Sequence, residues 1–541
     1  MKRQIPFIVA LILLSACIKG KHVDLVVHNA NIYSIDGKMS VYQAMAIKDG
    51  KIVELGPERE ILNAYSAENF INAEKKEIYP GLHDAHGHIM SYARQLLVCD
   101  LVGVGSYAAL ITRLEKFAQK EKPAIIQARG WDQSLWSNTT LPDNSLLNQA
   151  FPDIPVVCTR IDGHAVLAND KALELAGITP ETKVHGGKIA VKNGKCTGLI
   201  LDMAIEVMKK KLPQPTKAQL KTAILKVQDE LIAYGITNVH EAGLLMDEFA
   251  LFDELASENK LKLSVYAMLF PNEKSVEFVK ENGQYVNGNL TVRSFKIVGD
   301  GSLGSRGACL LHAYHDYNTT GFLTTSILNI QTTAKFAKEH NYQLNTHCIG
   351  DSTNRILLHL IDSLWGENDD HRWRIEHAQV IDQADFDLFN KSNAIPSVQP
   401  THAVSDMRWA EERLGKERLK GAYAYKTLLN QRKMIVFGTD FPVEKTNPFL
   451  TLHAAMNRKN NENEPNEGFL IEEAISFDNC IRAMTFWAAM ARFEEKSSGS
   501  LERNKDATFV IIDNPMQRGK VYQPNYAWKT YHKGTAIFSM D

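Results

Sequence analysis

Short β-prone runs alternate with helix-like runs through the centre of this chain, and this alternation constrains its fold more than any other feature. Lys217 to Ala233 and Asn329 to His340 have the apolar spacing of helices that cover a sheet. Strands alternating with helices favour parallel βα units, and eight of them predict a closed (β/α)₈ barrel. The candidate strands are Ile78 to His83, Ile236 to Glu241, Leu263 to Leu269, Ser294 to Val298, Gln343 to Cys348, Trp373 to His377, Ile395 to Gln399 and Met434 to Gly438.

One connection in this expected barrel is far longer than the crossover between two parallel strands requires. The first expected strand ends near His83 and the second begins near Ile236, about 150 residues later, whereas a βα crossover needs only a dozen or so residues. We therefore expect a barrel over 79–494 that carries an inserted subdomain over about 90–225.

The two ends of the chain share a β-rich character. Neither end has enough strands for a stable sheet of its own, so we expect 22–78 and 495–541 to form one small β-sandwich together. The runs in question are Asp24 to His28, Ala44 to Ile47, Lys51 to Leu55, Ala507 to Ile512 and Thr535 to Phe538.

The first 16 residues have the pattern of a targeting segment. A cationic start at Met1-Lys2-Arg3 precedes a mostly apolar stretch from Ile5 to Leu14, which is too short to span a membrane comfortably. Leu14-Ser15-Ala16-Cys17 resembles the lipobox of bacterial lipoproteins. That resemblance implies a signal peptide over 1–16, lipidation of Cys17, and a mature protein anchored in the cell envelope and facing the periplasm or the exterior.

Composition excludes some functions. The formal net charge is −2, and no basic run with interleaved aromatic residues occurs, so we expect no nucleic-acid partner. The six cysteines beyond Cys17 have irregular spacing without a CxxC pair, and we interpret them as buried free thiols.

Polar residues that bind metals stand at the ends of the expected strands. His86 and His88 follow strand one with the i, i+2 spacing that places two imidazoles on one side of an extended chain. His347 ends strand five, His377 ends strand six, and Asp440 follows strand eight. The carboxyl ends of barrel strands converge on one mouth, so these residues predict a shared metal site.

Strand four adds Lys296 to the same mouth. A protonated lysine, with an ordinary pKa of about 10.4, would repel a metal. A lysine that loses its proton there can bind carbon dioxide, and the carbamate has two oxygens that bridge two metals. The alternative is a plain ammonium paired with Asp300 or with a substrate group.

These residues and the sequence motifs around them resemble the amidohydrolase superfamily, and in particular the branch called amidohydrolase family 3, the YtcJ-like proteins. The resemblance covers the chain from about 24 to the end. It implies the barrel and the split sandwich independently of the strand count. The matching sequence motifs are Tyr79 to His86, Arg129 to Asp132, Arg160 to His164, Asp300 to Arg306, His347 to Asp351, Arg374 to Gln379 and Gly438 to Val443. Gly307 stands where the branch pattern leads us to expect threonine.

The resemblance implies two divalent metals, which imidazole and carboxylate ligands suit as zinc. We expect His86 and His88 to hold one, His347 and His377 the other, and carbamylated Lys296 to bridge them. Asp440 then ligates the first metal and shuttles the proton of a bridging hydroxide to the leaving amine. The expected reaction is hydrolysis of a C–N, amide-type bond in a small molecule.

Weaker candidates surround this set. Arg306, Arg374 and Glu376 are candidates for holding the ligands in place. The candidate substrate contacts are Trp131, Asp132, Arg160, His164, Arg306, Gln399 and His402.

Three alternatives stay open at this stage. One is a mononuclear deaminase of the same superfamily, although such enzymes typically lack the strand-four lysine. The second is a prolidase- or dipeptidase-like specificity at the same binuclear site, and the third is a surface binding lipoprotein without activity. The sequence leaves the substrate and the oligomeric state open, and a homodimer is one state that it permits.

Overall fold

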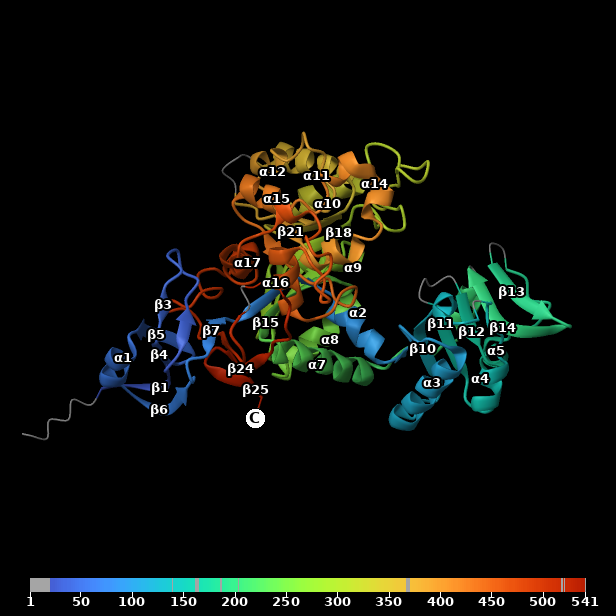
Figure 1. Cartoon of the computed structure of the whole chain (residues 1–541), viewed down its shortest axis with the longest axis horizontal. Helices are drawn as coiled ribbons and strands as arrows, with labels where there is room; N and C mark the ends of the chain where they lie inside the picture. The colour runs from blue at the N-terminus through green and yellow to red at the C-terminus, as the bar shows by residue number, and fades with distance from the viewer. Residues whose placement is uncertain are drawn as a thin grey trace, which may run out of the picture. The chain divides into compact units, whose positions relative to one another are not determined.

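The computed structural model describes residues 20–138, 140–160, 165–184, 187–202, 204–365, 370–516, 519 and 521–540 (Figure 1). The predicted signal peptide over 1–16, Cys17 and His164 lie outside these residues. The chain divides into two compact units, Met90–Lys226 and the rest, Met1–Ile89 with Val227–Asp541. Within the described part, no helix is both long enough and apolar enough to cross a membrane.

The larger unit contains the barrel, which confirms the predicted fold class. Eight parallel strands follow one another in the order of the chain. The strands are β8 (Leu82–Gly87), β15 (Ile236–Leu244), β16 (Ser264–Leu269), β18 (Leu290–Val298), β19 (Gln343–Cys348), β20 (Arg374–His377), β21 (Ile395–Val398) and β22 (Val436–Phe437). β17 (Tyr285–Asn287) pairs with β18 antiparallel.

The first and last barrel strands meet at their carboxyl ends. The amide of Asp440 donates to the carbonyl of His86 at 2.7 Å, and the amide of His88 donates to the carbonyl of Phe441 at 2.9 Å. Gly438 makes this approach possible, because a Cβ there would lie 2.4 Å from the amide nitrogen of His86. The barrel therefore closes where the candidate metal ligands begin.

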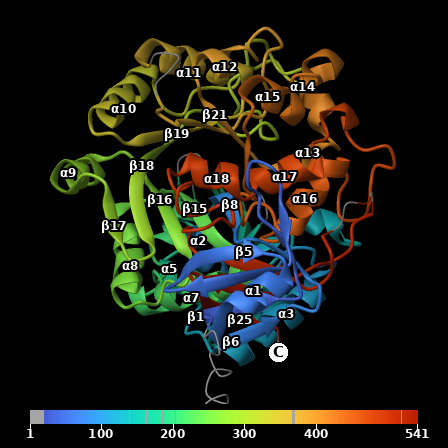
Figure 2. The ribbon, with the colours of Figure 1, turned by 90° about the vertical axis from the view of Figure 1, so that its left-hand side faces the viewer.

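Helices cover the outside of the barrel, so its strands are buried on both faces, although several of them, such as β8 (LHDAHG) and β19 (QLNTHC), contain buried polar residues. Figure 2 shows β15, β16 and β18 side by side, with α8 and α9 near them. The helices are α7 (Lys217–Ala233), α8 (Met246–Ser257), α9 (Glu273–Asn282), α10 (Ile327–Glu339), α11 (Asp351–Leu364), α12 (Leu388–Lys391), α13 (Pro400–Asp406), α14 (Ala410–Leu419), α15 (Tyr425–Arg432), α16 (Pro448–Asn457), α17 (Phe477–Ala483) and α18 (Phe486–Ala491).

The predicted first strand, Ile78 to His83, is wrong as a single element. The chain leaves one sheet after β7 (Glu77–Pro80) and enters the barrel with β8. Gly81 stands at the break, and a Cβ there would lie 2.1 Å from Thr237 Oγ1 and 2.8 Å from Thr508 Cγ2. The apolar run continues across the break because both strands are buried, so hydrophobicity alone shows one strand.

The two ends of the chain meet in a pair of sheets in the same unit. One sheet has the order β5-β4-β1-β6 and the other β25-β24-β23-β7-β2-β3. Apolar residues of both, such as Val27, Met45, Ile78 and Phe509, share one core. The elements are β1 (Lys21–His28), β2 (Asn31–Tyr33), β3 (Val41–Tyr42), β4 (Ala44–Lys48), β5 (Lys51–Gly56), α1 (Glu58–Ala64), β6 (Tyr65–Asn72), β23 (Phe509–Ile512), β24 (Ala527–His532) and β25 (Thr535–Ser539).

The smaller unit has a six-stranded sheet of its own, in the order β13-β14-β12-β11-β10-β9. Leu110 and Leu147, from α3 and α4, belong to one core cluster of this unit, whereas Leu173 and Met208, from α5 and α6, belong to another. The elements are β9 (Cys99–Asp100), α3 (Tyr107–Glu121), β10 (Ile126–Trp131), α4 (Ser145–Ala150), β11 (Val156–Arg160), β12 (Ala165–Ala168), α5 (Asp170–Ala176), β13 (Gly187–Lys192), β14 (Lys195–Asp202) and α6 (Ile205–Lys209).

Candidate metal centre

The side chains predicted as metal ligands all come from the carboxyl ends of barrel strands. His86 lies in β8 with His88 just beyond it, Lys296 lies in β18, His347 in β19, His377 ends β20, and Asp440 follows β22. His377 and Asp440 both adopt left-handed backbone angles, with φ of 73° and 61°. Such angles are sparsely populated outside glycine and concentrate at functional sites.

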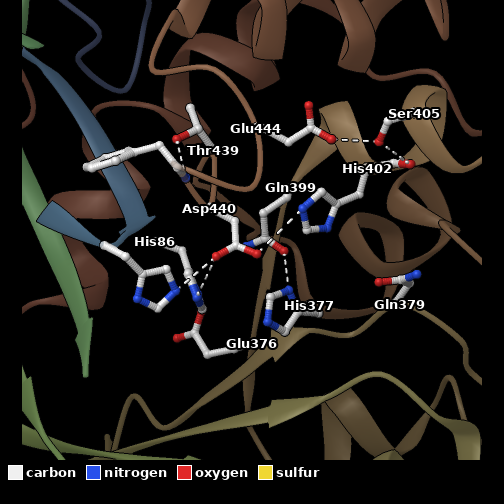
Figure 3. A network of polar contacts seen from close by, with 12 residues as sticks. His86, Glu376, His377, Gln379, Gln399, His402, Ser405, Thr439, Asp440 and Glu444 are labelled. Carbon is white, nitrogen blue, oxygen red and sulfur yellow. Dashed lines mark hydrogen bonds and ion pairs between the residues drawn. The ribbon is translucent and has the colours of Figure 1, made fainter. Parts of the chain in front are cut away.

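Asp440 lies at the middle of this group (Figure 3). Its Oδ1 atom is 3.0 Å from His88 Nε2 and 3.6 Å from His86 Nε2. Lys296 Nζ lies 3.1 Å from the same His86 nitrogen. Ligand atoms of His86, His88 and Asp440 lie within 4.8 Å of one another, which suits coordination of one cation.

The second oxygen of Asp440 faces other histidines. His402 Nε2 lies 3.5 Å from Asp440 Oδ2, and His377, His402 and Asp440 form a second group whose ligand atoms lie within 4.8 Å of one another. His347 packs against His377 with ring centroids 4.4 Å apart, and its buried Nε2 has no hydrogen-bond partner. The structure thus adds His402, which we expected only as a substrate contact, to the candidate ligands.

Two buried side chains orient the histidines. Glu376 Oε2 lies 2.5 Å from His86 Nδ1, and Arg374 donates to the other carboxylate oxygen of Glu376 at 2.7 Å. Gln399 Oε1 lies 2.7 Å from His377 Nδ1. Bonds of this kind fix the tautomer and leave Nε2 as the metal-binding nitrogen. Gln399 is buried and bonded to a candidate ligand, and its expected role as a substrate contact stays a prediction.

Burial keeps these imidazoles neutral. Desolvation, with the nearby Lys296 charge, lowers the pKa of His86 to about 4 and that of His347 to about 3. Burial likewise lowers the pKa of His377 well below its usual value. Neutral imidazole is the form that binds a metal, so the histidines are ready for coordination at neutral pH.

The two carboxylates of the centre stay ionised in spite of burial. Burial alone would raise the pKa of Asp440, but the hydrogen bond from His88 and the neighbouring His86 and His377 hold it well below its usual value. In the same way, Arg374 and His86 lower the pKa of Glu376 to about 2 against the effect of burial. The centre thus offers anions where cations would be held.

The surroundings of Lys296 bear on whether the residues of the centre fit two metals. It is 3% exposed, burial lowers its pKa, and in the described part of the chain no carboxylate lies within ion-pair distance of its Nζ. Asp300, its expected alternative partner, instead accepts hydrogen bonds from the amides of Ile349 and Gly350. A buried ammonium without a directly paired anion is costly, so the donor set fits a neutral or carbamylated lysine beside cations.

The remaining described residues among the predicted contacts are held by other partners. Trp131 is fully buried in the core of the smaller unit and its indole donates to the carbonyl of Cys158, whereas its expected role in substrate binding stays a prediction. Asp132 and Arg160 form an ion pair of 2.7 Å in that unit, where their predicted role stays a prediction. Arg306, in the connection between β18 and α10, pairs with Asp316 at 2.6 Å.

Sequence reasoning missed a carboxylate that joins the barrel ends. Asp84 of β8 accepts hydrogen bonds from the amide and the hydroxyl of Thr439 and from the amide of His86. Burial raises the pKa of Asp84 to about 7. Asp84 and Thr439 stand inside the motifs HDAHGH and GTD. Of the residues in these motifs, only the expected metal ligands were assigned a role from the sequence.

The profile of the amidohydrolase family matches residues 69–538. The chain belongs to this family. Curated relatives are Protein LONG AFTER FAR-RED 3 of Arabidopsis thaliana, 28% identical over 90% of this chain and 87% of that protein, and putative amidohydrolase YtcJ of Bacillus subtilis, 26% identical over 90% and 93%. N-substituted formamide deformylase of Arthrobacter pascens is 22% identical over 91% and 93%.

A solved structure extends the likeness to metal dependence. An uncharacterised metal-dependent hydrolase from Pyrococcus horikoshii superposes with a TM-score of 0.77, at 26% identity, over 92% of this chain and 98% of that one. With the two candidate ligand groups, this makes the chain a metal-dependent hydrolase of the amidohydrolase family. The predicted superfamily and branch are confirmed.

Proposed function

We propose that this amidohydrolase cleaves a C–N bond of the amide type in a small molecule, with two divalent cations bound at the candidate metal centre. The observation that carries the proposal is the division of Asp440 between two histidine groups. Oδ1 faces His86 and His88, and Oδ2 faces His402 beside His377.

The residues divide between the two cations as follows. His86, His88 and Asp440 would hold the first, and His377 with His347 or His402 the second. Lys296, as a carbamate, would supply oxygens to both. Imidazole and carboxylate ligands suit zinc. Such cations act as Lewis acids and lower the pKa of bound water to about 7.

Asp440 would move the proton. Its carboxylate is ionised, so it accepts the proton of the attacking water at neutral pH. It would then pass this proton to the leaving nitrogen, so that one carboxylate serves as base and acid in turn. His402 lies 3.5 Å from Oδ2, where it would orient the carboxylate during this transfer.

Support for the bond type comes from the family and from one relative. N-substituted formamide deformylase is named for removing formyl from a substituted nitrogen, a reaction that cleaves a C–N bond. We therefore place N-substituted amides first among the candidate substrates, followed by N-acyl amino acids, cyclic amides and carbamates.

The test combines metal analysis with an activity screen across those four bond types. The proposal expects about two metals per chain and chelator-sensitive cleavage in one class. In Asp440→Asn we expect kcat to fall by about 10²–10⁴-fold, since a positioned acid–base group contributes that much. One metal per chain with ammonia released from a ring would favour the deaminase alternative. Normal turnover of Asp440→Asn with its metals bound would remove Asp440 from the proton path.

We also propose that Cys17 carries lipid and anchors the protein in the cell envelope. The support is the lipobox-like word Leu14-Ser15-Ala16-Cys17 after a short apolar stretch. On this proposal the hydrolase acts on substrates outside the cytoplasm.

A further inference from the structure

A second polar cavity lies at the other end of the barrel, where the strands begin. It has a volume of about 320 Å³ and lies within the larger unit. Asn238 of β15 and Ser264 of β16 line it near the starts of their strands, whereas the metal ligands stand at strand ends. On β18, Arg293 lines the cavity and Lys296 belongs to the metal centre. The cavity is therefore not part of the catalytic site.

The charges that line this cavity leave a surplus of cations. Two carboxylates line it, and each has a partner: Glu494 pairs with Arg492 at 2.7 Å, and Asp506 pairs with Lys51. Arg293 and Lys533 line the same space. Among the described residues, no carboxylate lies within ion-pair distance of either one, and Lys533 Nζ donates to the neutral amide oxygen of Asn289 at 3.3 Å. Two positive charges thus face the cavity without a fixed counter-charge.

Arg293 is held in place without being neutralised. Its guanidinium stacks on the ring of Phe493, 3.5 Å from the ring centroid, and its buried Nε has no hydrogen-bond partner. Arg372 lies over the same ring, but its guanidinium is already paired with Asp370 and Glu495. Stacking orients a planar guanidinium and leaves its edge free for an oxyanion.

Other donors surround the two cations. The buried Nε of Arg492, a residue only 1% exposed, also lacks a partner. Burial lowers the pKa of His532 to about 4, so this imidazole is neutral and can donate one hydrogen bond. Hydroxyl groups complete the lining, from Ser264, Thr291, Ser497, Ser498 and Thr508.

We propose that this cavity is a binding site for a small oxyanion, a phosphate, sulfate or carboxylate group, held chiefly by Arg293 and Lys533. Charge-assisted hydrogen bonds from a guanidinium fork and an ammonium are the contacts that such groups select. The volume exceeds that of an inorganic ion, so the ligand class is a small organic molecule that carries such a group. This proposal stands apart from the hydrolytic activity.

The test measures the binding of inorganic sulfate to the full-length, metal-loaded protein by isothermal titration calorimetry at constant ionic strength. We expect saturable binding to the wild type and a dissociation constant raised at least about tenfold in Arg293→Gln and in Lys533→Gln. Arg59→Gln, which changes an exposed arginine of α1, is the matched control and should bind like the wild type.

Location and folding are checked separately. Crystals soaked in selenate should show its anomalous signal beside Arg293. Arg293→Lys keeps the charge but not the fork and should bind with intermediate strength, and Lys533→Gln stands as an independent variant if Arg293→Gln does not fold. The absence of saturable binding, equal binding by all variants, or selenate at the metal centre alone would overturn the proposal.

Discussion

A single carboxylate organises the metal centre at the scale of residues. The two oxygens of Asp440 face different histidine groups, and the left-handed backbone at this position turns the side chain toward both. Around it, Glu376 is hydrogen-bonded to Nδ1 of His86, and Gln399 is hydrogen-bonded to Nδ1 of His377. The centre therefore depends on residues that would never touch a metal themselves.

Glu376→Gln tests that dependence. We expect metal affinity to fall by about 10–100-fold, since the variant keeps the shape but loses the charge that orients His86. Chelator competition with the purified protein measures this directly, and Glu281→Gln, on the exposed face of α9, is the control. Unchanged metal affinity in Glu376→Gln would show that the contact with His86 does not tune the centre.

The sequence predicts the roles of some residues in the centre and not those of others. The strand-end positions of His86, His347 and His377 follow from the alternation of strand-like and helix-like runs and from the family motifs around these residues. His402 carries no such signal, because it lies in the first turn of α13 and its direction depends on how that helix packs. Trp131 stands in a polar motif, where a large aromatic side chain suits a binding site and a core equally well, and the structure places it in a core.

Among the secondary-structure elements, the sequence predicts the positions of strands better than the boundaries between adjacent strands. β19 matches its predicted range, and α7 does too, because a glycine follows each of them two residues later, Gly350 after β19 and Gly235 after α7. The boundary between β7 and β8 was missed because both are buried and only Gly81 separates them. Tertiary packing decides that boundary.

Gly81→Ala should therefore be destabilising. The added Cβ would meet Thr237 Oγ1 at 2.1 Å, and overpacking of this kind costs about 1–3 kcal/mol. Gly37→Ala is the control, since a Cβ there meets nothing within 4 Å. Chemical denaturation compares the two, and equal stability of the two variants would mean that the chain relaxes around position 81 without cost.

The connection between β18 and α10 is tied to α14 through Asp316, which pairs with Arg306 and Arg413. The hydrogen bond from Arg306 lowers the pKa of Asp316 from 3.8 to about 2. Because the folded pKa lies below the unfolded value, the stabilisation is present above about pH 4 and is lost as the pH falls toward 2. Asp316→Asn should thus be less stable than the wild type at pH 6, and the gap should narrow with acid. A gap independent of pH would contradict this account.

At the scale of the whole molecule, the proposed lipid anchor decides where the enzyme acts. We expect the wild type to sediment with membranes and to incorporate labelled palmitate, and Cys17→Ser to do neither. A Cys99→Ser variant, altered at a buried thiol, is the control. Membrane association of Cys17→Ser without label would point to retention of the apolar stretch instead of lipidation.

The strand order of the second sandwich sheet has a consequence for biosynthesis. β7 lies between β2, near the start of the chain, and β23, which begins at Phe509. While a ribosome is still making the barrel, the backbone groups of Ile78 to Pro80 that later pair with β23 have no partner. Until the last segment emerges, this open strand edge can pair with other chains or be covered by a chaperone.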